Sequence, residues 1–235
     1  MIRVEPVSET CLIVYLGEQI DTQLAPRIGH LSQYLKEHFS QSLVEVIPSY
    51  TSLFIQYHPC LMTYHTLHTA IMQYADAMQQ SGSEPSSRVG KLITLPVFYH
   101  HEVGPDLPIV ASQHGLSFNQ VAEAHSKAIY TVCAIGFAPG FAFLASVDSL
   151  IATPRRAEPR LKIPAGSVGI ANEQTAVYPA DSPGGWQIIG NCPQSLFSPQ
   201  QQPMTPFEVG DRVKFQPISR DEFLHQGGVI WPHWK

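Results

Sequence analysis

The sequence predicts an α+β fold in two domains, the first over residues 1–86 and the second over residues 87–235. Three observations support this prediction. The first domain alternates strand and helix patterns in the order β-α-β-β-α. A small polar linker follows at residues 81–88. Beyond the linker, short strand patterns separated by turn residues follow at close spacing, which is typical of a small and mostly antiparallel barrel.

Two helices of the first domain are predicted from hydrophobic residues spaced three and four apart. The spacing occurs at Leu24, Ile28, Leu31, Leu35 and Phe39, and again, within a helix over about residues 61–80, at Leu67, Ile71, Tyr74 and Met78. Strands are predicted at residues 10–16, 43–47 and 50–57. This order predicts a split βαβ, ferredoxin-like domain.

The second domain is predicted to hold at least seven strands and few helices. Strands are expected at residues 91–97, 129–136, 167–171, 174–179, 185–190, 194–197 and 212–216. A short helix should follow Asp106, and a capping box at Ser117 and Gln120 opens a helix that runs to about Lys127. No internal repeat is evident.

Composition and charge exclude several classes of function. The formal charge of −5 offers no basis for binding nucleic acid or an anionic membrane surface. The four cysteines lie far apart, without a C-x-x-C pair, so neither a disulfide framework nor a metal site is expected. The N-terminus has no secretory leader pattern and no apolar run approaches a membrane span, so we expect a cytoplasmic protein.

A basic segment in the second domain predicts an anion-binding site. Arg155, Arg156, Arg160 and Lys162 supply four of the 14 Lys and Arg residues. Arginine is suited to bidentate capture of carboxylate or phosphate. Segments rich in Gly, Pro and aromatic residues surround this run, at Gly136–Phe141, Pro164–Ser167 and Ser182–Trp186. The alternative is a solvated charged loop that Glu158 partly neutralises, with the glycines and prolines serving only as barrel corners.

His125 is the candidate for proton transfer. It lies near the end of the helix that leads into the strand before Gly136, from which it could reach the same cavity. The alternative is a histidine favoured at a helix C-terminus by the helix dipole.

Motifs along the second domain resemble one known family. They are Gly104–Leu107, His125-Ser126, Gly136–Phe141, Thr153–Arg160, Ile163–Gly169, Gln174-Thr175, Tyr178-Pro179 and Ser182–Gln187. Together they resemble the KipI / allophanate hydrolase subunit 1 family, whose members include the B component of the ATP-dependent 5-oxoprolinase. The resemblance implies an N-terminal α+β domain and a C-terminal cyclophilin-like β-barrel.

The resemblance also implies partners and an activity. The partners would be an allophanate hydrolase subunit 2 type protein, which is the C component, and a LamB/YcsF type protein, which is the A component. The three would hydrolyse 5-oxoproline to glutamate, with ATP as co-substrate of the assembled complex. Two other family roles are alternatives: inhibition of a sensor histidine kinase, as by KipI, and a carboxyltransferase-type subunit of an amide carboxylase.

Under this hypothesis Arg155, Arg160 and Lys162 bind the small anionic substrate. The expected pocket is shaped by Phe137, Pro139, Gly140, Gly166, Ser167, Pro183, Gly184, Gly185 and Trp186. The sequence departs from the family pattern at the edge of this pocket, at Ala142, Phe143, Ala171, Asn172 and Ala176.

Overall fold

A computed structural model describes residues 2–19, 21, 23–80, 90–232 and 234. It divides into two compact units. One unit is Met1–Lys91 with Glu208–Asp211, and the other is Leu92–Phe207 with Arg212–Lys235. The domain boundary predicted between residues 86 and 87 lies outside the described residues.

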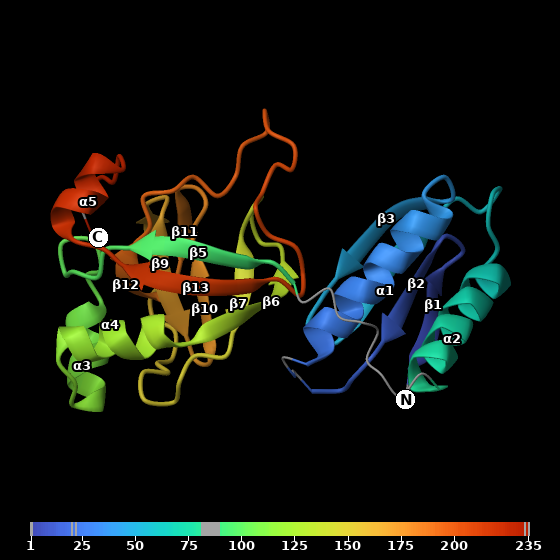
Figure 1. The fold of residues 1–235 in the computed structure, drawn as a ribbon, viewed down its shortest axis with the longest axis horizontal. Coiled ribbons are helices and arrows are strands. Elements are labelled where there is room, and N and C mark those ends of the chain that lie inside the picture. The colour runs from blue at the N-terminus through green and yellow to red at the C-terminus, as the bar shows by residue number, and fades with distance from the viewer. Residues whose placement is uncertain (1, 20, 22, 81–89, 233, 235) are drawn as a thin grey trace. The chain divides into compact units, whose positions relative to one another are not determined.

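The first unit is a four-stranded antiparallel sheet with two helices (Figure 1). Its elements are β1 (Arg3–Ser8), β2 (Cys11–Tyr15), α1 (Leu24–Phe39), β3 (Leu43–Pro48), β4 (Ser52–Tyr57) and α2 (Tyr64–Gln80). The sheet order is β1-β2-β4-β3, so β4 lies between the parallel strands β2 and β3. This is the split βαβ arrangement that the sequence predicts.

Strand β1, which was not predicted, pairs with β2 as an edge strand. Most of its residues are exposed, and Pro6 interrupts the strand pattern. The remaining elements bury one continuous core. Leu12 and Val14 of β2, Ile55 of β4 and Leu67 of α2 are all fully buried in it. The apolar spacing of the two helices therefore marks the face that packs on the sheet.

The second unit is a nearly closed seven-stranded barrel, the part of the chain expected to be cyclophilin-like. Its strands are β5 (Leu92–Val97), β6 (Ile129–Ile135), β7 (Ala142–Ala145), β9 (Ser167–Ala171), β10 (Gln174–Val177), β12 (Gln187–Asn191) and β13 (Arg212–Pro217), in the order β12-β9-β10-β7-β6-β13-β5. Only the β13–β5 pair is parallel among these described strands. A bridge between Phe98 and Asn191, with N···O distances of 2.9 and 3.0 Å, joins the two end strands.

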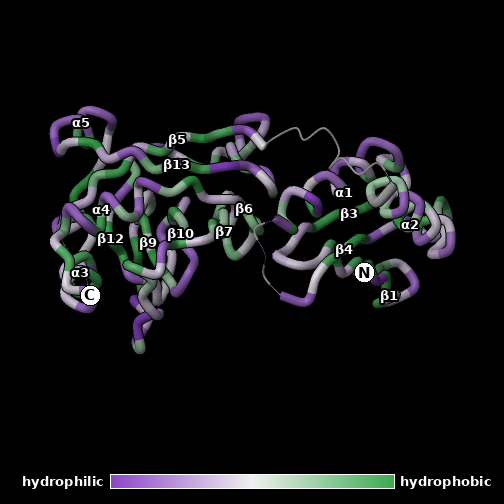
Figure 2. The backbone as a smooth tube through the Cα atoms, turned by 60° about the horizontal axis from the view of Figure 1, so that its bottom comes forward, coloured by the Kyte–Doolittle hydropathy of each residue, from purple (hydrophilic) through white to green (hydrophobic). Residues whose placement is uncertain are grey.

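Smaller elements complete the barrel unit. They are α3 (Leu107–His114), α4 (Phe118–Lys127), α5 (Arg220–His225) and a two-stranded sheet of β8 (Arg160–Ile163) and β11 (Ser182–Gly184). The predicted capping box opens α4, and a second one at Ser219 and Glu222 opens α5. Figure 2 shows hydrophobic residues along β5 and β13 and a mainly hydrophilic α5.

One predicted strand is wrong. Residues 194–197 form a loop, in which the Ser195 hydroxyl donates to the Phe197 carbonyl at 3.2 Å. This local hydrogen bond replaces a ladder contact, and Gln194 and Ser195 are exposed. The strands β7, β8 and β11, each three or four residues long, were not predicted.

A buried carboxylate at the start of α3 holds three other segments of the barrel unit in place. Asp106, just before α3, is fully buried. It accepts two hydrogen bonds from Arg160, at 2.7 and 2.8 Å, and one from the Arg156 Nη1 at 3.0 Å. The backbone N–H of Ile188 donates to the same carboxylate at 2.7 Å. Since these residues belong to α3, the basic segment, β8 and β12, Asp106 fixes their relative positions.

A neutral histidine lies in the core of the same unit. The hydroxyl of Thr175 donates to the Gly169 carbonyl at 2.9 Å, so it accepts from the Nε2–H of His125 at 2.8 Å. The Nδ1 of His125 then accepts from the Tyr99 hydroxyl at 2.7 Å. Burial lowers the pKa of His125 to about 3, so its ring is uncharged at neutral pH.

Substitution Asp106→Ala should strongly destabilise the barrel unit, because it leaves the buried Arg160 guanidinium without its anion. We expect a loss of about 3–5 kcal/mol in the free energy of unfolding, measured by urea denaturation. The matched control is Asp181→Ala. Asp181 pairs with Lys162 at 2.8 Å, but both side chains are about half exposed, so its loss should cost less than about 1 kcal/mol. Similar losses in the two variants would contradict this account.

The buried His125 should make stability depend on pH. Its pKa is lowered on folding, so between the unfolded pKa of about 6.5 and the folded pKa of about 3 only the unfolded chain is protonated. Stability should fall with decreasing pH in that window, by roughly 1.4 kcal/mol per pH unit from this group. Urea titrations of His125→Gln should show a shallower dependence than the wild type, whereas the exposed His225→Gln should keep the wild-type slope.

Candidate functional site

The cations of the basic segment differ in whether a carboxylate of the protein already pairs with them. Arg160 is 7% exposed and bound to Asp106, so its guanidinium is neutralised within the protein. Arg156 shares the same carboxylate and also donates to the Glu158 carbonyl at 3.3 Å. Arg155 is exposed and forms no ion pair with any described residue. Of the three cations predicted to bind the substrate, Arg155 is therefore the one whose charge is not already neutralised by a described side chain.

Arg155 lies over an aromatic ring of the third Gly/Pro segment. Its Cζ is 5.8 Å from the centre of the Trp186 ring, which is itself largely buried. The adjacent backbone is tied to that segment, because the Arg156 N–H donates to the Gly185 carbonyl at 2.7 Å. Pro183 and Gly184 lie in β11, which pairs with β8. Stacking on a fixed ring orients a guanidinium while leaving its donors available to a ligand.

The aromatic residues near Arg155 form a continuous cluster. Phe141 makes edge-on contacts with Phe137, Tyr178 and Trp186, with centroids 5.1, 5.3 and 5.7 Å apart. Phe137 differs from the others because it is 65% exposed. Its φ of 72° is unusual for a residue other than glycine, so the surrounding turn holds it in this conformation. The result is an apolar surface beside an available cation.

Tyr178 carries a polar group into this cluster, which the predicted site did not include. Burial raises the pKa of Tyr178 to about 12, and the positive charges of Arg155 and Arg160 counteract part of that rise. The phenol therefore stays protonated at neutral pH. The Tyr178-Pro179 motif was a sequence signal for this position.

Two glycines of the Gly/Pro segments allow loops to approach each other closely. Gly166 has a φ of 80°, and a Cβ there would collide with the Cys192 carbonyl oxygen. Gly140 has a φ of 79°, and a Cβ would lie 2.8 Å from the Leu196 carbonyl oxygen. Both positions therefore require glycine for packing. Pro139, by contrast, is exposed beside Gly140.

Two predicted site residues lie in the barrel interior. His125 is fully buried, with both ring nitrogens hydrogen-bonded, which suits a structural role. Ser167 is also fully buried, and its Oγ has no hydrogen-bond partner among the described residues. Neither side chain is brought to the exposed face of Arg155.

Lys162 lies at the margin of the site. Its Nζ pairs with Asp181 and lies 4.7 Å from the centre of the Trp231 ring. The hydrogen bond from Lys162 lowers the pKa of Asp181. Trp234 packs against the aromatic cluster and lies under Arg160, with 5.7 Å between Cζ and the ring centre. No function was predicted for the tail at residues 227–235, although it holds two of the three tryptophans.

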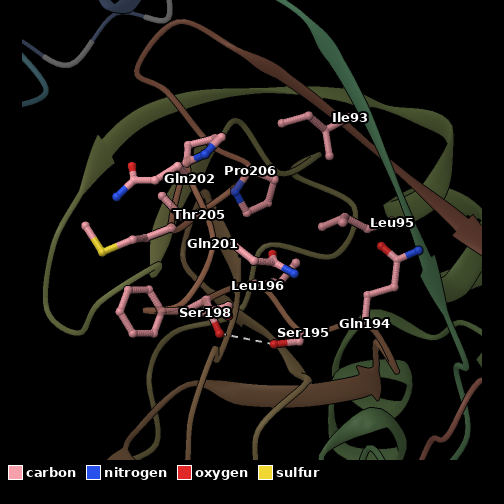
Figure 3. Close-up of a pocket in the computed structure, with 13 residues that line it drawn as sticks. Ile93, Leu95, Gln194, Ser195, Leu196, Ser198, Gln201, Gln202, Thr205 and Pro206 are labelled. Atoms are coloured by element: carbon pink, nitrogen blue, oxygen red, sulfur yellow. Dashed lines mark hydrogen bonds between the residues drawn. The ribbon is translucent and has the colours of Figure 1, made fainter.

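A cleft of about 440 Å³ lies elsewhere on the barrel unit, between β5 and residues 194–206 (Figure 3). None of the predicted site residues lines it. Across the described ranges, no three His, Cys, Asp or Glu side chains are grouped to hold a metal ion. In that same part of the chain, no helix is long and apolar enough to cross a membrane.

Solved structures support the two-unit fold. The crystal structure of TTHA0988 matches with a TM-score of 0.76 and 31% identity over 93% of this chain, which spans only 40% of that chain. The urea carboxylase of Kluyveromyces lactis matches with a TM-score of 0.68 at 18% identity, over 95% of this chain and 22% of its own, and shows the fold alone.

Sequence comparisons identify the family. Residues 2–207 match the model of the carboxyltransferase domain, subdomains C and D. The B component of the Bacillus subtilis 5-oxoprolinase is 36% identical over 94% of this chain and 95% of its own length. The B component from Escherichia coli O157:H7 is 40% identical over 90% of this chain and 94% of its own length. The chain therefore belongs to the carboxyltransferase-domain family that includes the B component of 5-oxoprolinase.

Proposed function

We propose that this chain is the B component of an ATP-dependent 5-oxoprolinase, which hydrolyses 5-oxoproline to glutamate. The observation that carries the proposal is the similarity to two proteins that bear this name. They are 36 and 40% identical to this chain, and each alignment covers at least 90% of both sequences. Matches of this extent include the central part of the chain, which holds the basic segment and the aromatic cluster.

The partners in this proposal are an allophanate hydrolase subunit 2 type protein and a LamB/YcsF type protein, with ATP as co-substrate of the complex. The geometry is consistent with a shared active site. On this chain Arg155 and Phe137 are exposed and contact the cluster at Trp186 and Phe141, respectively. A partner surface would supply the opposite wall and shield the reacting lactam from bulk solvent, while the one water that hydrolyses it is retained.

The chemistry of 5-oxoproline fits the available groups. The substrate carries a carboxylate, and we assign its binding to Arg155, whose guanidinium forms no ion pair with a described residue and is oriented by Trp186. Lys162, whose charge is paired with Asp181 at 2.8 Å, would contribute a hydrogen-bond donor at the margin of the site. Arg160 acts indirectly, since its bonds to Asp106 hold the basic segment in place. Phe137 and Trp186 would contact the apolar ring carbons.

A carboxyltransferase-type role is the second candidate. The family model is that of a carboxyltransferase domain, and the urea amidolyase of Saccharomyces cerevisiae is 23% identical over 90% of this chain and 13% of its own length. The higher identity and the coverage of the whole relative favour 5-oxoprolinase.

Reconstitution with the two partner proteins tests the proposed function. The three purified proteins together should form glutamate from 5-oxoproline with stoichiometric ADP release, and omission of this chain should abolish both. The comparison reaction contains urea, bicarbonate, ATP, a biotin carboxylase and its biotinylated carrier protein, so that carboxybiotin is available to a carboxyltransferase. Turnover of urea without turnover of 5-oxoproline would support the carboxyltransferase role instead.

Substitution Arg155→Ala should weaken substrate capture in the reconstituted complex. A lost charge-assisted hydrogen bond of about 1.5–3 kcal/mol corresponds to a decrease in kcat/KM of roughly 10- to 100-fold. Arg155→Lys should retain only part of the wild-type kcat/KM, because lysine cannot form two parallel hydrogen bonds to a carboxylate. Arg27→Ala removes an exposed guanidinium from α1 and should leave kcat/KM unchanged. Wild-type kinetics for Arg155→Ala would remove Arg155 from the site.

A further inference from the structure

The barrel has an open edge at β5. This strand ends the sheet order and pairs with β13 along its whole length. On its other side, the only bridge in the described part of the chain is that between Phe98 and Asn191. No described strand therefore covers the part of this edge that precedes Phe98.

Backbone alternation shows which groups this edge presents. The Val97 carbonyl accepts from the Ile218 N–H at 3.0 Å, on the β13 side, whereas Phe98 bonds to Asn191 on the opposite side. Successive residues of a strand direct their backbone groups to opposite sides. Thr94 and Leu92 therefore direct N–H and C=O to the open edge. The backbone groups of Pro96 are also directed to the open edge, so the absence of an N–H at this residue removes no hydrogen bond between β5 and β13.

The open edge adjoins the cleft of about 440 Å³. Ile93 and Leu95 of β5 line one side, and Gln201, Gln202, Thr205 and Pro206 are among the residues on the other (Figure 3). The loop that carries the latter bonds to itself, with Ser198 N–H donating to the Met204 carbonyl at 2.8 Å. This loop thus forms no ladder with β5 and is separated from it by the cleft.

The lining of the cleft indicates what it would accept. Its residues are Ile93, Leu95, Gln194, Ser195, Leu196, Phe197, Ser198, Gln201, Gln202, Pro203, Met204, Thr205 and Pro206, and none is charged. The Thr205 Oγ1 is buried without a hydrogen-bond partner in the described residues. An open strand edge beside neutral amides and apolar side chains suits an extended, uncharged polypeptide segment.

We propose that this cleft receives an extended, uncharged segment of the allophanate hydrolase subunit 2 type partner, which pairs with the open edge of β5 as a further strand. The proposal rests on the proposed function, which makes this chain one part of a complex. It is also supported by TTHA0988, where the same fold makes up about 40% of a longer chain and is therefore accompanied by further polypeptide.

The test uses purified chain and purified allophanate hydrolase subunit 2 type protein. In the free chain the amides of Leu92 and Thr94 should exchange rapidly with solvent, while those of Ile93 and Leu95, which face β13, should be protected. On complex formation Leu92 and Thr94 should become protected at least tenfold. Thr94→Pro should weaken binding at least tenfold by calorimetry, whereas Thr94→Val, which keeps the N–H, should bind as wild type.

A second pair of variants is independent of the strand itself. Gln201→Glu places a charge in the cleft and should weaken binding at least tenfold. Gln200→Glu lies in the same loop outside the cleft, and its side chain can still accept from the Ser198 hydroxyl, so it should bind normally.

The possible failures are distinguishable. Wild-type binding by both Thr94→Pro and Gln201→Glu, with unchanged exchange at Thr94, would overturn the docking site and leave the proposed function intact. Protection of Thr94 that grows with concentration of this chain alone would assign the edge to a second copy and overturn the partner. Absence of both binding and 5-oxoproline turnover would overturn the proposed function and the docking site together.

Discussion

The Asp106 carboxylate is the constraint on which the second unit depends. It is fully buried, yet it receives donors from two arginines and a backbone amide. Such a group is costly to bury unless every partner is in place, so the positions of α3, β8 and β12 are correlated through it. The available cation of the site, Arg155, gains its fixed location because its neighbours are tied down in this way. Asp106 thus neutralises Arg156 and Arg160 within the protein, and the exposed Arg155 keeps its charge at a fixed position.

The local patterns of the sequence predicted most of the regular elements. Helices α1 and α4 follow from apolar spacing and a capping box, and these signals depend only on residues a few positions apart. Strand β1 escaped prediction because most of its residues are exposed and Pro6 interrupts its pattern. The short strands β8 and β11 escaped it because they pair with each other across an intervening stretch of chain. The capping box at Ser219 was visible in the sequence and would have located α5.

The predicted site was harder to derive for the same reason. The clustering of Arg155, Arg156 and Arg160 was visible in the sequence, but their division into internal and external charges was not. That division depends on Asp106, which is 54 positions from Arg160 in the sequence. Similarly, no local feature of His125 indicates that Tyr99 and Thr175 enclose it. The clustering of arginines in the sequence predicts an anion-binding site. Which of these arginines is available to bind the anion is decided only by tertiary contacts.

The arrangement of the tryptophans has a practical consequence. The chain contains three, and each lies against a different cation of the basic segment or β8: Trp186 with Arg155, Trp234 with Arg160 and Trp231 with Lys162. Indole emission is sensitive to nearby charge, and none of these indoles belongs to the first unit. All tryptophan fluorescence of the unlabelled protein therefore comes from rings that contact these cations. Binding of an anion there should change the fluorescence, so no label is needed to detect it.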